Sequence, residues 1–279
     1  MSVLNNKIDF TVIFSVKKAN PNGDPLDGNR PRVDYDGFGE MSDVCVKRKI
    51  RNRLQDMGER IFVQSDERSD DGCRSLRERA DSCAELKTIK KDNDKYSEIA
   101  CREWIDVRSF GQVFAFKGLD VSVGVRGPVT VQTAVSVAPI DTQSMQITKS
   151  VNSETKDKKA SDTMGMKHRV DFGVYKFNGS INVQLAEKTG FTEDDAEKIH
   201  EAIKTLFEND CSSARPEGSM EILRVYWWKH NCKTGQYPSA KVHRSVTVDV
   251  NGDGKCLEDY NINYTSLDGL EAEIFDGLQ

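Results

Sequence analysis

Arginine and lysine side chains recur in short motifs of this sequence, at positions that suit phosphate binding. Each such side chain supplies a positive charge together with several hydrogen-bond donors. Lys47, Arg48 and Arg51 lie within about one turn of each other if their segment is a helix, so they are placed to grip consecutive phosphates. The remaining candidates for binding a phosphate-bearing polyanion are Asn20, Arg30, Arg32, Arg108, Arg126, Lys149, Lys167 and His168.

Each of these residues also has a simpler explanation. A single cation is accounted for equally well by a solvated surface position or a local ion pair. Asn20 also suits the chemistry of a turn, and His168 suits an exposed position. Met145 and Ile147 are apolar residues in an otherwise polar segment. A wedge between nucleic-acid bases and packing on a neighbouring subunit both account for this apolar pair.

A strand and a helix must position the first of these residues. Apolar and polar residues alternate from Ile8 to Lys17, which predicts a strand with one buried face. The connector from Asn20 to Arg32 is too rich in Gly, Pro, Asn and Asp for regular structure. Ser42 then offers an N-cap for a helix to about Met57. This helix has one narrow apolar stripe and a basic outer surface formed by Lys47, Arg48, Lys49, Arg51 and Arg53.

Further strands and a helix complete the pattern. Strands are predicted at Val129–Val137, at Val170–Leu185 with Gly179 as a bulge, and at Met220–Trp228. Thr192 caps the helix that precedes the last strand. The order strand, helix, strand, strand, helix, strand predicts an α+β fold with a ferredoxin-like, RRM-like βαββαβ core. Two large insertions decorate it: a mixed-charge, partly helical segment after the first helix, and a long projecting loop over residues 139–169.

Composition excludes several classes of protein. Charged residues make up 30% of the chain, the net charge is −5, and no apolar run is long enough to span a membrane. The seven cysteines form no C-x-x-C pair, so we expect reduced thiols in a cytoplasmic protein without a zinc site. The stretch from Asp249 resembles an EF-hand loop but carries Tyr260 where the calcium ligand Glu belongs. We therefore expect no metal, no cofactor and no catalytic residue.

Four motifs carry a family resemblance. They are Asn20-Pro-Asn-Gly-Asp24 with Gly28-Asn-Arg-Pro-Arg32, then Asp106-Val-Arg-Ser-Phe-Gly-Gln-Val-Phe114, then Val125-Arg-Gly-Pro-Val129, then Thr163-Met-Gly-Met-Lys-His-Arg-Val-Asp-Phe-Gly-Val-Tyr175. In this order they resemble the CRISPR Cascade backbone subunit family, most closely its type I-C branch. The motifs spread over residues 20–175, and the βαββαβ order extends the resemblance to about Trp228.

The resemblance implies a non-catalytic RAMP subunit, shaped like a hand, that polymerises along a CRISPR RNA (crRNA). Its partners are then the crRNA, target DNA through guide pairing, further copies of itself in a helical filament, and other Cascade subunits in an antiviral ribonucleoprotein. Carried over, residues 1–60, 126–138 and 170–230 form the RRM-like palm. Residues 61–125 form the fingers, 139–169 the thumb, and 231–279 a C-terminal extension. The protein would read RNA backbone and shape, and leave sequence recognition to base pairing.

Two other functions remain open. Backbone subunits of type III complexes cut RNA with a thumb-side aspartate, and Asp141 and Asp162 lie in the corresponding insertion. Metal-assisted cleavage needs more ligands than one carboxylate, and no cluster accompanies these residues. The third possibility is a standalone protein that binds single-stranded RNA.

Overall fold

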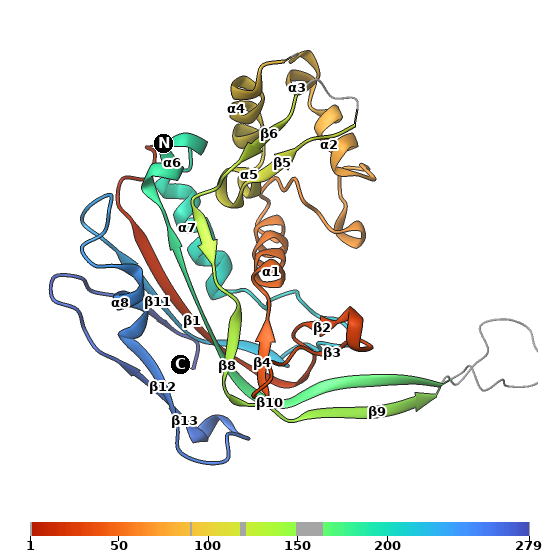
Figure 1. The fold of residues 1–279 in the computed structure, drawn as a ribbon, viewed down its shortest axis with the longest axis vertical. Helices are drawn as coiled ribbons and strands as arrows, with labels where there is room; N and C mark the ends of the chain where they lie inside the picture. Colours follow the sequence, from red (N-terminus) through yellow and green to blue (C-terminus); the bar gives the residue numbers. More distant parts are fainter. Residues whose placement is uncertain (1, 90, 118–120, 149–163, 279) are drawn as a thin grey trace, which may run out of the picture.

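An eight-stranded antiparallel sheet organises the α+β fold of the computed structural model, which describes residues 2–89, 91–117, 121–148 and 164–278 (Figure 1). The main path of the sheet runs in the order β14-β11-β1-β10-β8-β4, and β7 and β9 pair with β10 off this path. Its strands are β1 (Ile8–Ala19), β4 (Phe38–Met41), β7 (Val129–Val131), β8 (Ala134–Pro139), β9 (Thr142–Thr148), β10 (Met164–Ile181), β11 (Met220–Lys229) and β14 (Glu273–Asp276).

Strand β1 lies at the centre of this sheet, between β10 and β11. The alternating apolar residues Ile8, Phe10, Val12, Phe14 and Val16 face one layer, as predicted, whereas Ile13 faces the other. The expectation of a single buried face is wrong, however, because Asp9, Thr11 and Ser15 on the other face are buried as well. Both faces of β1 are therefore covered by other parts of the chain.

Two helices cover one face. Helix α1 (Asp43–Asp56) begins after the predicted N-cap Ser42, whose hydroxyl accepts from the Cys45 amide. Helix α7 (Glu193–Lys204) begins with a capping box between Thr192 and Asp195. The apolar stripes of α1 and α7 pack with the inner residues of β1, β10 and β11 into the largest core of the protein.

The C-terminal extension covers the opposite face. It contains α8 (Ser239–Arg244), β12 (Val246–Val250) and β13 (Tyr260–Tyr264), so it is more regular than the sequence indicates. We call β12, β13 and the connecting residues 251–259 the C-terminal hairpin. Its apolar residues pack on Ile13, Val174 and Trp228 of the sheet. The EF-hand-like stretch thus forms the connection between the two paired strands β12 and β13.

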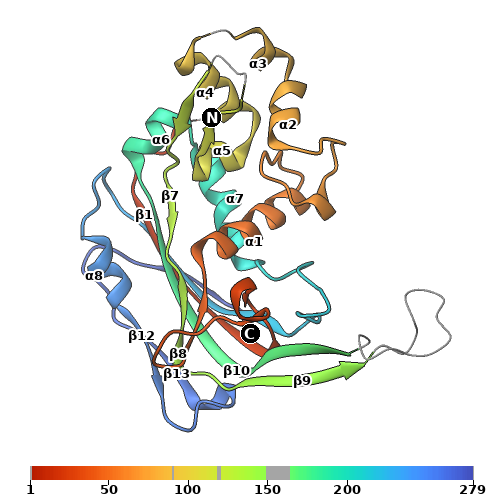
Figure 2. The ribbon, with the colours of Figure 1, turned by 45° about the vertical axis from the view of Figure 1, so that its right-hand side comes forward.

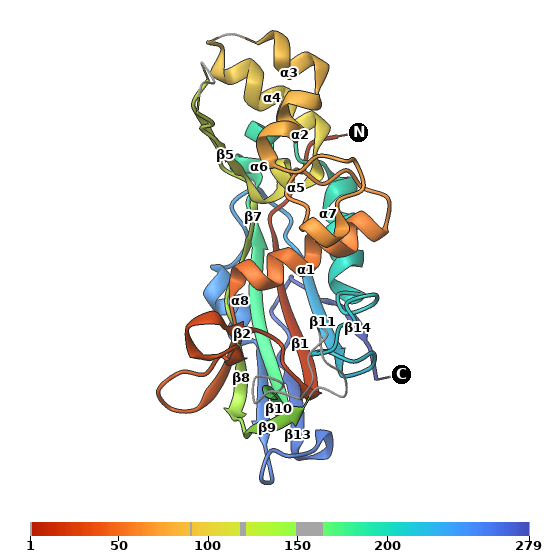
Figure 3. The same ribbon diagram turned by 90° about the vertical axis from the view of Figure 1, so that its right-hand side faces the viewer.

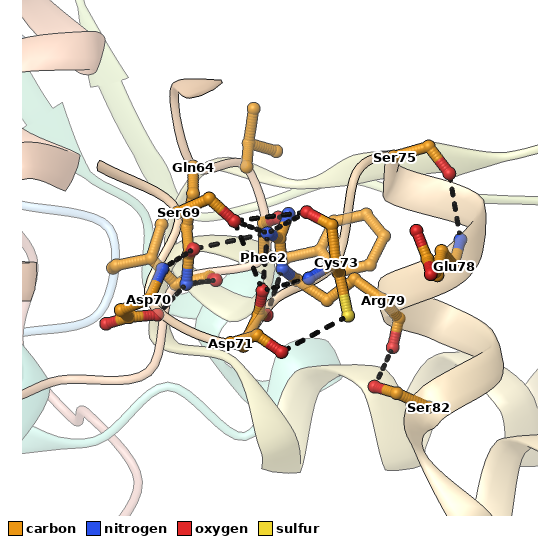
Figure 4. A network of polar contacts seen from close by, with 12 residues as sticks. Phe62, Gln64, Ser69, Asp70, Asp71, Cys73, Ser75, Glu78, Arg79 and Ser82 are labelled. Atoms are coloured by element: carbon orange, nitrogen blue, oxygen red, sulfur yellow. Dashed lines mark hydrogen bonds and ion pairs between the residues drawn. The ribbon is translucent and has the colours of Figure 1, made fainter. Parts of the chain in front are cut away.

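The described residues between 62 and 125 form a helical lobe with a separate core, at the top of Figures 1, 2 and 3. Its elements are α2 (Leu76–Ser82), α3 (Ala84–Thr88), α4 (Asn93–Glu103), α5 (Ile105–Phe110), β5 (Gln112–Phe114) and β6 (Val123–Val125). Arg79, which is 4% exposed, connects α2 to the segment that precedes it. It pairs with Asp71 and donates to the carbonyl oxygen of Phe62 at 2.9 Å (Figure 4). This arginine holds the pKa of Asp71 down at about 2.

Strands β9 and β10 extend beyond the sheet as a two-stranded arm, which we define as Thr142–Thr148 with Met164–Val170 (Figures 1 and 2). The expectation of an irregular loop over residues 139–169 is wrong for these parts, which are paired strands. The predicted strand at Val170–Leu185 ends earlier, because Val183 and Leu185 belong to helix α6 (Val183–Thr189).

Gly179 is not a bulge. It pairs in register with Phe10 and Val131. A Cβ atom at this position would lie 2.1 Å from the Phe10 ring and 2.5 Å from the Thr130 carbonyl oxygen. The glycine is required there because two neighbouring strands approach it closely.

Candidate nucleic-acid interface

The connector after β1 folds back onto the N-terminus of α1. It contains the short strands β2 (Gly23–Asp24) and β3 (Arg30–Pro31), which the sequence does not predict. The Asn22 side-chain oxygen accepts from both the amide and the hydroxyl of Ser42, each at 3.0 Å. The Asn20 amide group donates to the carbonyl oxygen of Asn29 at 2.8 Å. These hydrogen bonds hold the first motif against the first turn of α1.

A second loop, residues 205–219 after α7, completes this region. The backbone N–H of Asn20 donates to the Ala214 carbonyl oxygen at 2.9 Å, and the backbone N–H of Lys17 donates to the Ser219 carbonyl oxygen at 2.8 Å. We call the combined surface the α1 corner and define it by Asn20, Asn22, Arg32, Ser42, Lys49, Asp210, Arg215 and Ser219. No motif in the sequence points to the residues of this second loop.

Three cations surround the first turns of α1 in this corner. Lys49 is 4% exposed and pairs with Asp210, which also accepts from Arg215 at 3.1 Å. The expectation that Lys49 lies on the outer surface of the helix is wrong, because the 205–219 loop covers it. Burial raises the pKa of the Cys45 thiol, while the positive charges of Lys49, Arg215 and Arg32 act in the opposite direction. Their positive charge adds to the positive end of the α1 dipole, which favours anions.

Two buried polar atoms in this corner have no hydrogen-bond partner among the described residues. They are the side-chain oxygen of Asn20 and the hydroxyl of Ser219. Ser219 lines a small cavity of about 180 Å³ together with Asp210 and Arg215. Unsatisfied polar groups beside cations are consistent with a polar ligand, since leaving such groups unpaired is costly.

The predicted basic cluster on α1 is largely engaged within the protein. Lys47 pairs with Asp43 at 2.9 Å, and Arg48 donates to the carbonyl oxygen of Val63. Arg51 is 12% exposed and pairs at 3.0 Å with Asp106, which is fully buried. Lys47 thus pairs within α1, whereas Arg48 and Arg51 join α1 to the helical lobe, so the geometry does not favour three adjacent phosphate contacts.

The other predicted arginines differ in their surroundings. Arg108 forms a two-pronged ion pair with Asp195, at 2.9 and 2.7 Å. Arg30 is half exposed and lies 3.4 Å from Asp27, and Arg32 lies 3.4 Å from Asp24. Arg126 is exposed, and no carboxylate of the described ranges lies within 4 Å of it. Of these four, Arg126 has the guanidinium group that is most available to a ligand.

Two glycines fix the place of Arg126. A Cβ atom at Gly111 would lie 2.3 Å from the Val125 carbonyl oxygen, and one at Gly127 would lie 2.3 Å from that of Ser109. Gly111 also has a φ of +83°. The second and third sequence motifs therefore cross in close contact, which explains why both need glycine.

The arm presents a different chemistry on each face. Residues directly opposite each other in an antiparallel pair share a face, and Met145 stands opposite Lys167, with Ile147 opposite Gly165. His168 lies on the second face, where its ring nitrogen Nδ1 is 2.8 Å from the Ser144 hydroxyl. Lys149 lies outside the described residues.

The second face also carries two methionines that are not among the predicted wedge residues. Met164 and Met166 are 57% and 55% exposed, slightly more than Ile147 at 50%. Met145 is half-buried. Their apolar side chains in an otherwise polar segment are the sequence feature that could have identified Met164 and Met166 as wedge candidates beside Met145 and Ile147.

The described residues contain no group of three or more His, Cys, Asp or Glu side chains able to hold a metal ion. Asp141 is exposed and pairs with Lys255 at 3.3 Å, while Asp162 lies outside the described residues. In the part of the chain that is described, no helix is long and apolar enough to cross a membrane.

The sheet, the α1 corner and the arm define an α+β protein similar in fold to a subunit of an RNA-guided complex. A chain of a solved structure, "CRISPR RNA-guided surveillance complex, pre-nicking", superimposes with a TM-score of 0.51 at 15% identity, over 84% of this chain and 83% of that one. The family model "CRISPR-associated protein Cas7" matches residues 6–265, so the chain belongs to the Cas7 family. A curated relative, the CRISPR-associated protein Cas7 of Haloferax volcanii, is 24% identical over 241 residues, which cover 79% of this chain and 69% of the relative.

Proposed function

We propose that this protein is a non-catalytic, multi-copy backbone subunit of a CRISPR surveillance complex, of the Cascade kind, that binds crRNA along its phosphate backbone. The observation that carries the proposal is the match to the Cas7 family model over residues 6–265. The four motifs further favour the type I-C branch. The partners in this proposal are crRNA, target DNA through guide pairing, neighbouring copies in a helical filament, and other Cascade subunits in the cytoplasm.

We also propose that the core is ferredoxin-like, with the palm, finger and thumb division given above. In support, β1, α1, β7 with β8, β10, α7 and β11 follow each other in the chain, and their strands lie in the order β11-β1-β10-β8. The C-terminal extension packs on the face of the sheet that an RNA-recognition motif uses for base stacking. The guide is therefore expected to bind at the α1 corner rather than on this face.

In the α1 corner, Arg32 and Arg215 are the cations that retain exposed surface, and we propose that they contact successive phosphates. Asn20 and Ser219 supply neutral hydrogen-bonding groups beside them. Arg30, Arg126 and Lys167 extend the positive surface toward the lobe and the arm. Arg32 and Arg215 also have carboxylate partners, but their side chains stay 37% and 28% exposed. The side chains of Lys47, Arg51 and Arg108 are less exposed, at 24%, 12% and 16%, and Arg48 donates to the Val63 carbonyl oxygen, so these four contribute less in this scheme. Met145, Ile147 and the two exposed methionines are the wedge candidates on the arm.

The test compares Arg32→Gln and Arg215→Gln with Arg74→Gln, a control at an exposed arginine of the helical lobe. Binding to a short single-stranded RNA is measured at several salt concentrations. Each corner variant should weaken binding and reduce the steepness of the salt dependence by about one phosphate contact. Equal binding by all three variants would place the RNA elsewhere. Shortening of the RNA in magnesium would instead support an endoribonuclease.

A further inference from the structure

Strand β10 belongs both to the central sheet and to the arm. Val170 is the junction, since it pairs with Ala19 of β1 on one side and with Thr142 of β9 on the other. From Arg169 to Met164, β10 pairs within the described residues with β9 alone. A ribbon of two strands has little stability of its own and twists readily, so its direction depends on how the junction is held.

One face of the junction is packed around Ile140. A Cβ atom at Gly173 would lie 2.9 Å from the Cγ2 atom of Ile140, and one at Gly39 would lie 2.7 Å from its Cδ1 atom. The ring of Tyr175 lies against the same two glycines. Backbone and side chains therefore meet here without spare room.

The C-terminal hairpin holds the other face. The Phe172 and Tyr260 rings lie 6.1 Å apart, and Tyr260 is 9% exposed. The Tyr260 hydroxyl donates to the Gly254 carbonyl oxygen at 2.9 Å, which fixes the tip of the hairpin. Next to this tip, Lys255 pairs with Asp141, whose carbonyl oxygen accepts from the Asp171 amide at 3.0 Å and closes the base of the arm.

We propose that the C-terminal hairpin sets the direction of the arm, with Tyr260 and Lys255 as positioning residues. Tyr260 supports β10 at Phe172, and the Lys255–Asp141 pair, which is exposed to solvent, adds a weaker restraint at the turn from β8 into β9. Neither residue needs to touch RNA. This proposal rests on the proposed function in one respect: the direction of the arm matters for assembly if, in the proposed filament, the arm of one copy crosses the RNA held by its neighbour.

The test uses Tyr260→Leu with Tyr264→Leu as its matched control. Both tyrosines lie on β13, but Tyr264 packs on Tyr226 and Trp228, at 5.2 and 6.1 Å between ring centroids, and makes no such contact at the arm. Hydrogen exchange of the backbone amides of β9 is measured without RNA. Tyr260→Leu should speed this exchange by about 2- to 12-fold, the factor that corresponds to the loss of one aromatic pair. Tyr264→Leu should leave β9 unchanged.

The second readout is assembly on a full-length guide, compared with binding to a short RNA that covers one copy. Tyr260→Leu should bind the short RNA normally but give an irregular nuclease footprint on the guide, and Lys255→Glu should shift the footprint in the same direction. Equal β9 exchange in the two tyrosine variants would overturn the proposal. Regular footprints from both tyrosine variants would also overturn it. Failure of the wild-type protein to bind RNA would instead refute the proposed function, and the exchange experiment would still decide the role of the hairpin.

Discussion

Replacing Arg108 with methionine tests whether this arginine serves the fold or the RNA. Its guanidinium group is 16% exposed and pairs through two hydrogen bonds with Asp195, which is 3% exposed. Arg108 lies in α5 of the helical lobe, and Asp195 lies in the first turn of α7. The pair therefore joins the lobe to the helical layer over the sheet.

Removing one partner of such a pair leaves a buried charge without compensation, which typically costs about 3–5 kcal/mol. Asp195 would keep its bonds to the amide and hydroxyl of Thr192, which places the expected cost toward the lower end. One kcal/mol shifts the melting temperature of a protein of this size by roughly 2–4 °C, so a loss of about 3 kcal/mol should lower the melting temperature of the variant by roughly 6–12 °C. Arg102→Met is the control, because Arg102 pairs with Glu85 in solvent and should not shift melting measurably.

Thermal and urea unfolding followed by circular dichroism measure the stability, and titration with a short RNA at low temperature measures binding. We expect Arg108→Met to lose stability and to keep its RNA affinity while folded. The opposite pattern, with stability equal to that of Arg102→Met and weaker RNA binding, would refute this reasoning. That result would support the original prediction that Arg108 binds RNA.

Three further predictions concern a closely packed glycine, an ion pair of the helical lobe and two cysteines. Gly179→Ala should destabilise the protein by about 1–3 kcal/mol or more, because the new methyl group meets backbone and ring atoms, whereas Gly165→Ala on the arm should be nearly neutral in urea unfolding. The pKa of Asp71 is lowered to about 2, so its contribution to stability is complete above its ordinary pKa near 4 and is lost as the pH falls through 2. The stability of the lobe in the Asp71→Asn variant should therefore fall less between pH 4 and pH 2 than that of the wild-type protein, as measured by acid unfolding. Burial raises the pKa of Cys101 to about 12, so mass spectrometry after alkylation at pH 8 should find Cys101 unmodified and the exposed Cys211 modified.

The sequence predicts those elements whose signal is local. Ser42 and Thr192 cap the expected helices, and the strand predicted at Met220–Trp228 matches β11 within one residue. Periodicity fails where tertiary packing decides. The polar face of β1 is buried because a distant segment, the C-terminal extension, covers it, and no window around β1 contains that information.

The α1 corner shows the same limit for a site. Its first motif was found because Asn, Gly and Pro are conspicuous in a connector. Arg215 comes from a loop more than 150 residues later and carries no motif of its own. Lys49 and Arg51 look like surface cations beside Lys47 in the sequence, yet their carboxylate partners, Asp210 and Asp106, are distant in the chain. Only the fold reveals which cations are already neutralised.

The central claim is that copies of this chain assemble along a guide RNA without cutting it. The most direct measurement is native mass spectrometry of the purified protein with a CRISPR guide RNA in magnesium, followed by nuclease treatment and analysis of the RNA. Our account predicts a discrete particle with several copies of the chain and one intact, protected guide. A monomer with shortened RNA would contradict it.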